Sequence, residues 1–511
     1  MRRREGVLTM SMLVFALGVV SAQDNPSPQS PAEPQSTQQP VPAYGQGTTP
    51  PSSSENPPLS GLDLPSLEPH AAPLSYLQPG ATFSESVSTN IENSIGGSST
   101  GSISRGLGNL ALKRLWSNYD LSLDYLGGIA YYTRGPGLKQ VQAFGVTQKI
   151  LWKRGELSLR DSFSYLPEGN FGGAYGSLGS VGVTTMGHTP FGAFWGGNAF
   201  GAFGITPRIV NVAIADVTER LTPKSSFTAA GGYAFTHFYG DDTNSTTFIG
   251  SSQVSAQAGY NRILTPHTQV ALVYGYQGFD FTVVGTAFHS HIIQGMVGHR
   301  ITGRMDLLLG AGPQFTRIGI ACNILDVLNG DPHCSLDQTG NAVGTIPTDR
   351  INVAAQARLR YKFTKSTMDL RYERFQTSGG GLFAGAQSDI IHLSVERPLS
   401  RVWSLSADVG YAHNDRIQPL TQEQIDACLG GSQSSQNACP ANDAKTYNYG
   451  FVGAALHRHF GHNWHGFVSY QDNELSFDRS FCTTTAPCDR TSNRQVVTFG
   501  LDWTPRPIRI D

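Results

Sequence analysis

The connections in this chain are of two kinds, and they constrain its fold more than any motif does. From about residue 80 to the end, the chain consists of runs in which apolar and polar residues alternate. Some connections between the runs are only a few residues long, namely 221–224, 264–267, 302–304, 364–366, 399–401 and 461–463. Other connections are long and polar, and all six cysteines lie in these. Because each antiparallel hairpin reverses the chain, we expect short turns at one end of the protein and long loops at the other.

The alternation is clearest between residues 351 and 363, where every odd position is apolar and the even positions include Arg358, Arg360 and Lys362. In a strand, successive side chains point to opposite faces. A soluble sandwich alternates in the same way, but the runs here extend over 11 to 17 residues. That length exceeds the roughly five or six residues of typical soluble strands and suits a tilted membrane crossing.

Counting these runs predicts an all-β protein, a transmembrane antiparallel up-and-down β-barrel. Eighteen strands are preferred, and sixteen remain the alternative if the first two runs are not strands. Aromatic residues gather near the ends of the runs, where membrane barrels carry girdles. The expected strands are 81–92, 101–115, 119–133, 138–152, 156–166, 207–221, 225–240, 246–263, 267–283, 286–301, 304–319, 350–364, 366–377, 386–398, 402–414, 447–460, 464–477 and 493–503.

The amino-terminal region divides into two parts. Residues 1–22 combine three arginines, an apolar stretch and Val20-Ser21-Ala22, which is typical of a cleaved secretion signal. Residues 23–79 hold nearly half of the chain's 29 prolines among Ser, Gln and Thr. Such a composition buries too little apolar surface to fold, so we expect a disordered periplasmic linker, able to contact peptidoglycan or to act as a spacer without a partner.

Composition separates the remaining residues, 80–511, from soluble domains. Charged residues make up 14% of the chain, against roughly 25% in typical soluble proteins. The net charge of −2 lacks the basic excess that nucleic-acid binding requires. With its short turns, long loops and signal, the chain resembles Gram-negative outer-membrane β-barrels of the porin type. The resemblance implies a place in the outer membrane with both termini periplasmic, contact with lipid and lipopolysaccharide, and insertion by the barrel-assembly machinery, which would recognise Phe499 or Trp503 in the last strand.

With the apolar face assigned to lipid, a set of charged residues is predicted to line the lumen: Arg160, Asp306, Arg358, Arg360, Lys362, Asp369, Arg371, Glu373, Glu396 and Asp408. A charge facing lipid at mid-depth costs about 2–4 kcal/mol. Four of them, Arg358, Arg360, Lys362 and Arg371, could form a basic ladder that attracts anions. Alternatively, Asp369 and Glu373 neutralise them in cross-strand pairs, so ion selectivity stays open.

Two further sets of residues carry expectations for the long connections. Segment 167–206 is Gly-rich and aromatic, which predicts a constriction inside the barrel made by Phe194, Trp195, Phe200 and Phe203; an exposed adhesive loop is the alternative. The cysteines fall in three close pairs, whose local pairing in an oxidising compartment would stiffen the outer loops. Local pairing would join Cys322 with Cys334, Cys428 with Cys439, and Cys482 with Cys488, although six cysteines allow fifteen connectivities. A zinc site is the weaker alternative, because none of the pairs has C-x2-C spacing.

The function predicted from these features is a porin-like channel for passive diffusion of small hydrophilic solutes, since barrels of 16 to 18 strands tend to leave an aqueous lumen. The alternative is a non-conducting structural or adhesive barrel with a plugged lumen. An enzyme is not expected, because neither G-x-S-x-G nor H-E-x-x-H occurs. No cofactor is predicted, and a metal at the histidines between 457 and 465 is the weaker reading of that cluster.

Overall fold

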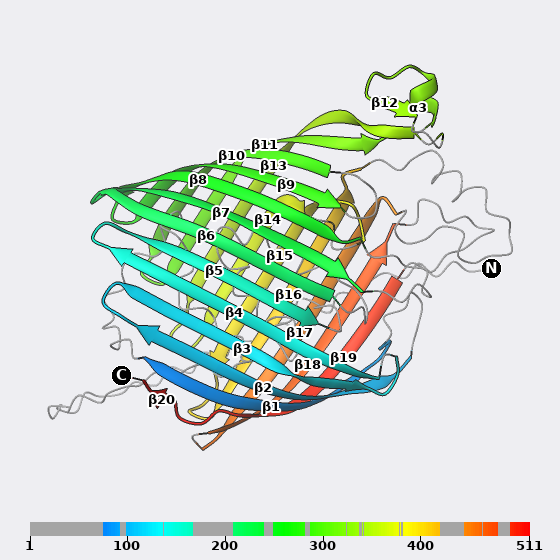
Figure 1. The fold of residues 1–511 in the computed structure, drawn as a ribbon. Coiled ribbons are helices and arrows are strands. Elements are labelled where there is room, and N and C mark those ends of the chain that lie inside the picture. Colours follow the sequence, from blue (N-terminus) through cyan, green and yellow to red (C-terminus); the bar gives the residue numbers. More distant parts are fainter. Residues whose placement is uncertain are drawn as a thin grey trace, which may run out of the picture. The chain divides into compact units, whose positions relative to one another are not determined.

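The computed structural model describes residues 75–91, 99–135, 137–166, 208–239, 249–281, 287–322, 324–336, 340, 342–377, 379, 382–418, 444–461, 463–478 and 491–510. These residues form an antiparallel β-barrel (Figure 1). Among the described residues, no helix is long and apolar enough to cross a membrane. The expected signal and linker, residues 1–22 and 23–79, lie outside this part except for the first residues of the first strand.

Eighteen strands form the barrel wall, since two of the twenty strands in the sheet, β12 (Cys334–Leu336) and β20 (Ile508–Arg509), are short additions. The preferred strand count is therefore confirmed. The wall strands are β1 (Tyr76–Ser88), β2 (Gly101–Leu115), β3 (Tyr119–Tyr132), β4 (Leu138–Trp152), β5 (Gly155–Leu166), β6 (Arg208–Thr222), β7 (Ser225–Phe238), β8 (Ser251–Thr265), β9 (Thr268–Phe281), β10 (Ala287–Thr302), β11 (Met305–Ala321), β13 (Ala342–Lys362), β14 (Thr367–Thr377), β15 (Ala386–Pro398), β16 (Trp403–Arg416), β17 (Thr446–Phe460), β18 (Trp464–Phe477) and β19 (Thr491–Trp503).

The barrel is closed by its first and last wall strands. Each wall strand pairs antiparallel with the next one along the chain, with β11 pairing to β13 across the short β12. β1 pairs with β2 on one side and with β19 on the other, from Ala81↔Trp503 to Ser88↔Val496. Ser86 Oγ and Thr498 Oγ1, 412 residues apart in sequence, lie 2.9 Å from each other at this junction. The meander thus closes on itself, which suits a membrane-spanning sheet.

The observed strand ends follow the alternation closely, with larger differences at the starts of three strands. β8 starts at Ser251 instead of residue 246. β1 starts at Tyr76 instead of residue 81, because Tyr76 and Leu77 pair with β2 and also with β20. β13 starts at Ala342 instead of residue 350, because its outer part stays paired with β11 as far as Ala321↔Thr345. The alternation could not predict this extension, since the residues before 350 do not alternate.

The two faces of the wall differ in polarity as the alternation predicts. Large apolar side chains lie exposed on the outer face, among them Leu272, Val353 and Val468, each more than half exposed. The opposite positions of the same sheet carry buried polar side chains such as Gln277 and Gln314, both 0% exposed. An apolar outer face and a polar inner face are the reverse of a soluble barrel and characterise barrels that span membranes.

One hairpin extends past the long-loop end of the wall. Figure 1 shows β11 and β13 continuing beyond their neighbours to a tip that carries α3 (Ile324–Leu328) and β12. A disulfide joins Cys322 to Cys334 at this tip, as expected, and β12 pairs with β13 from Cys334↔Gly344 to Leu336↔Ala342.

The other two expected disulfides lie outside the described residues. These are the pair of Cys428 with Cys439 and the pair of Cys482 with Cys488. Their local pairing stays a prediction.

The pairing of the wall is interrupted between β13 and β14. Their shared rungs run from Lys362↔Thr367 only as far as Ala355↔Arg374. Beyond this point β13 continues beside β11, and β14 continues beside β15 up to Thr377↔Ala386. On the long-loop side of Ala355↔Arg374, the described residues of β13 and β14 have no common rung. We call this stretch the seam.

Candidate channel interior

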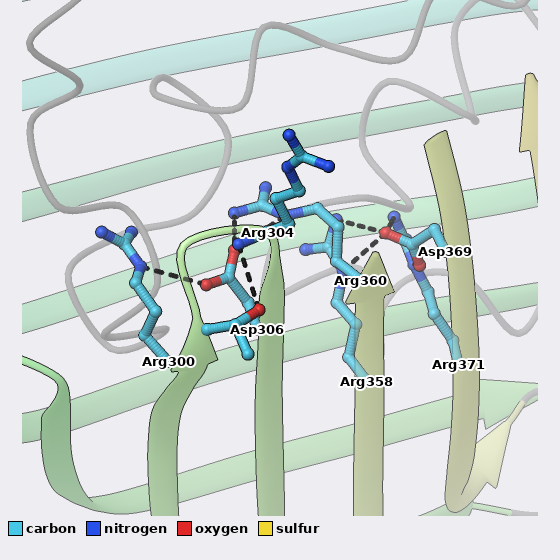
Figure 2. A network of polar contacts seen from close by, with 8 residues as sticks. Arg300, Arg304, Asp306, Arg358, Arg360, Asp369 and Arg371 are labelled. Carbon is cyan, nitrogen blue, oxygen red and sulfur yellow. Dashed lines mark hydrogen bonds and ion pairs between the residues drawn. The ribbon is translucent and has the colours of Figure 1, made fainter. Parts of the chain in front are cut away.

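A cluster of charged side chains lies near the short-turn end of β10, β11, β13 and β14, and we call it the arginine cluster (Figure 2). The strand registers place its members on one face, because Arg300 is opposite Asp306, Asp306 is opposite Arg360, and Arg358 is opposite Arg371. All members except Arg300 were expected to line the lumen. The cluster consists of Arg300, Asp306, Arg358, Arg360, Asp369 and Arg371.

Asp306 joins two arginines across neighbouring strands. Arg300 Nε donates to Asp306 Oδ1 over 3.2 Å, and Arg360 Nη2 donates to Asp306 Oδ2 over 2.8 Å. The Asp306 side chain is only 9% exposed, so both contacts are largely shielded from solvent. Charge-assisted hydrogen bonds of this kind hold long side chains in fixed positions.

Asp369 makes a second junction beside the first. Arg358 Nε donates to Asp369 Oδ2 over 2.8 Å, and Arg371 Nε donates to Asp369 Oδ1 over 2.7 Å. The neutralising alternative expected Asp369 and Glu373 to pair with the arginines. Asp369 does so, but the second carboxylate is that of Asp306. Glu373 lies farther along β14, opposite Gln356. Because four arginines face two aspartates, the cluster keeps an excess of positive charge.

The opposite face of the same strands shows which way the cluster points. The positions between the charged residues hold Met305, Leu307, Leu359 and Leu370. Leu370 and, on the same face of β11, Leu309 are exposed on the outside of the wall. Since successive side chains of a strand point to opposite faces, the charged side chains lie on the inner face.

The remaining expected lumen residues are distributed around the wall. Arg160 of β5 forms an ion pair with Asp216 of β6. Asp408 of β16 accepts a hydrogen bond of 2.8 Å from His392 Nε2 on β15 if that nitrogen carries the proton. Lys362 lies opposite Thr367 at the short turn. The side chain of Glu396 lies outside the described part of the structure.

A belt of glutamines occupies the inner face next to the arginine cluster, toward the long-loop end. Gln314 Nε2 donates to Ser290 Oγ over 2.8 Å, and Gln356 Nε2 lies 3.5 Å from Gln294 Oε1. Gln257, Gln277 and Gln294 line a pocket together with Gln356. Because amide groups both donate and accept hydrogen bonds, this belt offers contacts to uncharged polar solutes as well as to ions.

The connection between β14 and β15 folds into the barrel, and we call residues 379 and 382–385 the hairpin tip. Phe383 is 0% exposed, its ring centroid lies 5.0 Å from that of Tyr447 on β17, and the Arg416 guanidinium lies 5.5 Å from it. On the opposite side, Ala384 belongs to a buried cluster with Phe279, Phe281, Phe288 and Ile318 of β9, β10 and β11. The hairpin tip therefore bridges two separate parts of the inner wall near the long-loop end.

Local conformation explains how this connection turns inward. Gly379 and Gly385 have φ values of 73° and 91°, a region that only glycine adopts without strain. A Cβ atom on Gly385 would come within 2.6 Å of the Phe288 ring, so the backbone approaches the wall more closely than any other residue allows. The sequence signal is an apolar pair, Leu382-Phe383, within a run of glycines, and such a pair does not by itself indicate which way a connection folds.

The constriction expected from the sequence lies elsewhere in the chain. Segment 167–206, with Phe194, Trp195, Phe200 and Phe203, lies outside the described residues. Among the residues that the structure describes, the inward-folded segment is the hairpin tip, and its aromatic contact is made by Phe383.

Comparison with known proteins finds likeness of structure and none of sequence. No family model and no curated protein matches the sequence. Among solved structures, OccK2 (OpdF) of Pseudomonas aeruginosa matches with 11% identity, covering 83% of this chain and 98% of that one, at a TM-score of 0.38. The outer membrane protein opdK of Pseudomonas aeruginosa matches with 10% identity, 84% and 98% coverage and a TM-score of 0.39. The ferric citrate transporter FecA matches with 9% identity, 85% and 79% coverage and a TM-score of 0.39.

At these values the likeness carries no argument about activity. The closed eighteen-strand meander with short turns at one end nevertheless confirms the architectural resemblance to outer-membrane barrels of the porin type, since this combination defines that class.

Proposed function

We propose that this protein is an outer-membrane channel for passive diffusion of small hydrophilic solutes. One observation carries the proposal: a closed wall of eighteen strands has an apolar outer face and an inner face that bears the arginine cluster and the glutamine belt. Eighteen-stranded membrane barrels have room for water in the interior. Charged groups inside a membrane protein are retained where they face a water-filled interior or a transported solute.

The proposal includes a place and an orientation. The short turns lie on the periplasmic side with both chain termini, and the tip with the Cys322–Cys334 disulfide lies outside the cell, where disulfides persist. The residues from 23 to the start of β1 at Tyr76 then form a periplasmic linker. Catalysis is not part of the proposed function, and the function needs no cofactor.

Conductance tests the proposal directly. We would refold the full-length mature chain, verify the folded barrel by its heat-dependent electrophoretic mobility, and record single channels in a planar bilayer with asymmetric salt. Stable current steps with a reproducible reversal potential support the channel. A folded barrel that gives no steps at any applied voltage contradicts it.

A specific observation also favours the second candidate, a barrel with a plugged lumen that serves a structural or adhesive role. Val210, Val212 and Ile214 of β6 share one buried apolar cluster with Ile292 of β10 and Ala354 of β13. These strands are not neighbours in the wall, so the cluster crosses the interior, and the hairpin tip bridges the interior nearer the long loops. Under this alternative, the wild-type protein is silent and opens only when one of these apolar contacts is removed.

A further inference from the structure

The seam between β13 and β14 is an interruption in the wall that the proposed channel does not use. In a continuing ladder, Ala354 would lie opposite Phe375 and Val353 opposite Gln376, but the shared rungs end at Ala355↔Arg374. Gln376 instead donates from Nε2 to Thr316 Oγ1 of β11, over 2.6 Å. Since Thr316 faces the interior, β14 has bent inward, away from the edge of β13.

A pocket lies at the level where the ladder ends. Its lining includes Ala355 and Arg374, which form the last shared rung and belong to the outer face, and also Gln277, Gln294 and Met296 of the inner face. The pocket therefore reaches both strands at the point where their ladder ends. Its lining is mixed and includes the glutamine amides and Glu373 as well as Ile292, Met296 and Phe375.

The β14 side of the seam is polar on the face that should contact lipid. Arg374 Nη1 lies 3.1 Å from Asp389 Oδ2, and the Tyr372 hydroxyl donates to Asp389 Oδ1 over 2.7 Å. These residues alternate with inner-face positions and follow Leu370 on the outer face, so the ion pair points outward. An outward-facing ion pair is unfavourable in hydrocarbon and is stable where water or a polar group reaches it.

The β13 side of the seam is apolar. Val353 and Ile351 continue its outer face beyond Ala355 and are 56% and 72% exposed. The apolar surface of β13 therefore extends farther toward the long-loop end than the rung of Ala355 with Arg374. The two edges of the seam thus differ, with apolar side chains on β13 and an ion pair with a tyrosine hydroxyl on β14.

The backbone at the seam also requires a polar neighbour. Residues 352–354 of β13 would lie opposite residues 375–377 in a continuing ladder, but they pair with β11, and in the described part of the chain no strand pairs with them on the other side. Within a membrane, peptide groups without hydrogen-bonding partners are strongly disfavoured, so an open strand edge cannot face lipid tails. Where the described strands leave this edge unpaired within the membrane, water or a molecule that supplies hydrogen bonds would satisfy it.

We propose that the seam is a lateral portal that binds a slender amphipathic molecule and lets it pass between the barrel interior and the outer leaflet. The apolar edge of β13 and the pocket residues Ile292, Met296 and Phe375 suit an alkyl chain, while the glutamine amides suit a head that donates and accepts hydrogen bonds. The Glu373 carboxylate on this pocket disfavours a carboxylate head, which leaves an uncharged head such as a hydroxyl. The inference rests on the membrane placement proposed above but not on ionic conductance.

Disulfide trapping tests whether the seam is open. The double variant V353C/Q376C places thiols where a continuing ladder would bring them together, and A357C/Y372C places them on a shared rung of the same outer face as the matched control. Mass spectrometry of the digested barrel identifies the joined peptides and separates them from those of the native cysteines. We expect the control pair to oxidise, because paired strands bring Cα atoms within disulfide range, and the seam pair to remain reduced. Oxidation of the seam pair as complete as that of the control would mean a closed wall and would overturn the portal.

Photolabelling tests the ligand class in the same barrel, held in lipid nanodiscs. The probe is a long-chain alcohol that carries a diazirine in its alkyl chain, and the comparison probe is the corresponding fatty acid. We expect the alcohol to label peptides containing Ala354 and Phe375, to be displaced by unlabelled alcohol, and to label more than the acid does. Uniform labelling of all outer faces, or equal labelling by the acid, would overturn the proposal. Single-channel recording of the same preparation shows separately whether the channel proposal fails.

Discussion

Replacing Phe383 by alanine should release the hairpin tip from the inner wall and leave the strand pairing of the barrel wall intact. The Phe383 ring is fully buried against Tyr447, and its neighbours Leu382 and Ala386 belong to the same buried cluster as Phe477 and Leu475 of β18. The strand ladders on both sides of the tip, β14 with β15 and β15 with β16, do not involve this side chain. The substitution should therefore weaken the docking of the hairpin tip against the inner wall and leave the strand ladders unchanged.

The magnitude follows from the burial. Truncation of a fully buried phenylalanine costs about 3–5 kcal/mol, which combines lost apolar transfer energy with the cavity left behind. Each 1.4 kcal/mol corresponds to about a tenfold change in an equilibrium constant. The ratio of docked to undocked tip should therefore fall by about two to four orders of magnitude, so an undocked state that is rare in the wild-type protein becomes measurable.

Single-channel recording in a planar bilayer measures this change. We expect F383A to show a larger unitary conductance or a much greater open probability than the wild type, with unchanged heat-dependent mobility. The matched control is F315A, which makes the same substitution on the outer face of β11, where Phe315 is 43% exposed. Identical current records for F383A, F315A and the wild type would refute the idea that the hairpin tip narrows the interior.

Three further predictions concern other parts of the chain. D306N removes a carboxylate from the arginine cluster. A unit charge about 8 Å from the ion path in water changes the energy of a passing ion by about 0.5 kcal/mol, so the reversal potential should shift toward anions by about twofold in permeability ratio. D326N in α3 is the control. Reduction of Cys322–Cys334 removes a constraint of about 3 kcal/mol, so limited proteolysis should cut the tip faster while the barrel keeps its mobility. Deletion of residues 24–74, which ends before β1, should change cell-wall association, measured by co-sedimentation with peptidoglycan, and leave barrel assembly intact.

The alternation of apolar and polar residues was sufficient to predict the wall, because side-chain period and strand register are set by the same pleat. It placed Arg358, Arg360 and Arg371 on one face, and the structure brings them together with Asp306 and Asp369. The pairing partners were harder to predict, since a strand pattern gives the face of a residue but not its level relative to the next strand.

The seam and the hairpin tip could not be predicted from the pattern for a related reason. Both depend on where a ladder ends and on which distant wall a connection contacts. Arg374 and Asp389 did carry a signal, because each interrupts an otherwise apolar outer face. Because β14 and β15 are adjacent strands, the two charged residues together indicate an ion pair on the outer face.

The junction of β1 with β19 has a consequence for how this protein is made. The rungs from Ala81↔Trp503 to Ser88↔Val496 join the two ends of the wall, so the barrel cannot close until almost the whole chain has been synthesised and exported. Contacts of such sequence separation form slowly, because the intervening chain must first be brought into place. Until then, many apolar strand faces and two strand edges are exposed in water, where they favour aggregation. A chain truncated before residue 496 should therefore accumulate as an unclosed, protease-sensitive sheet, however well its earlier hairpins form.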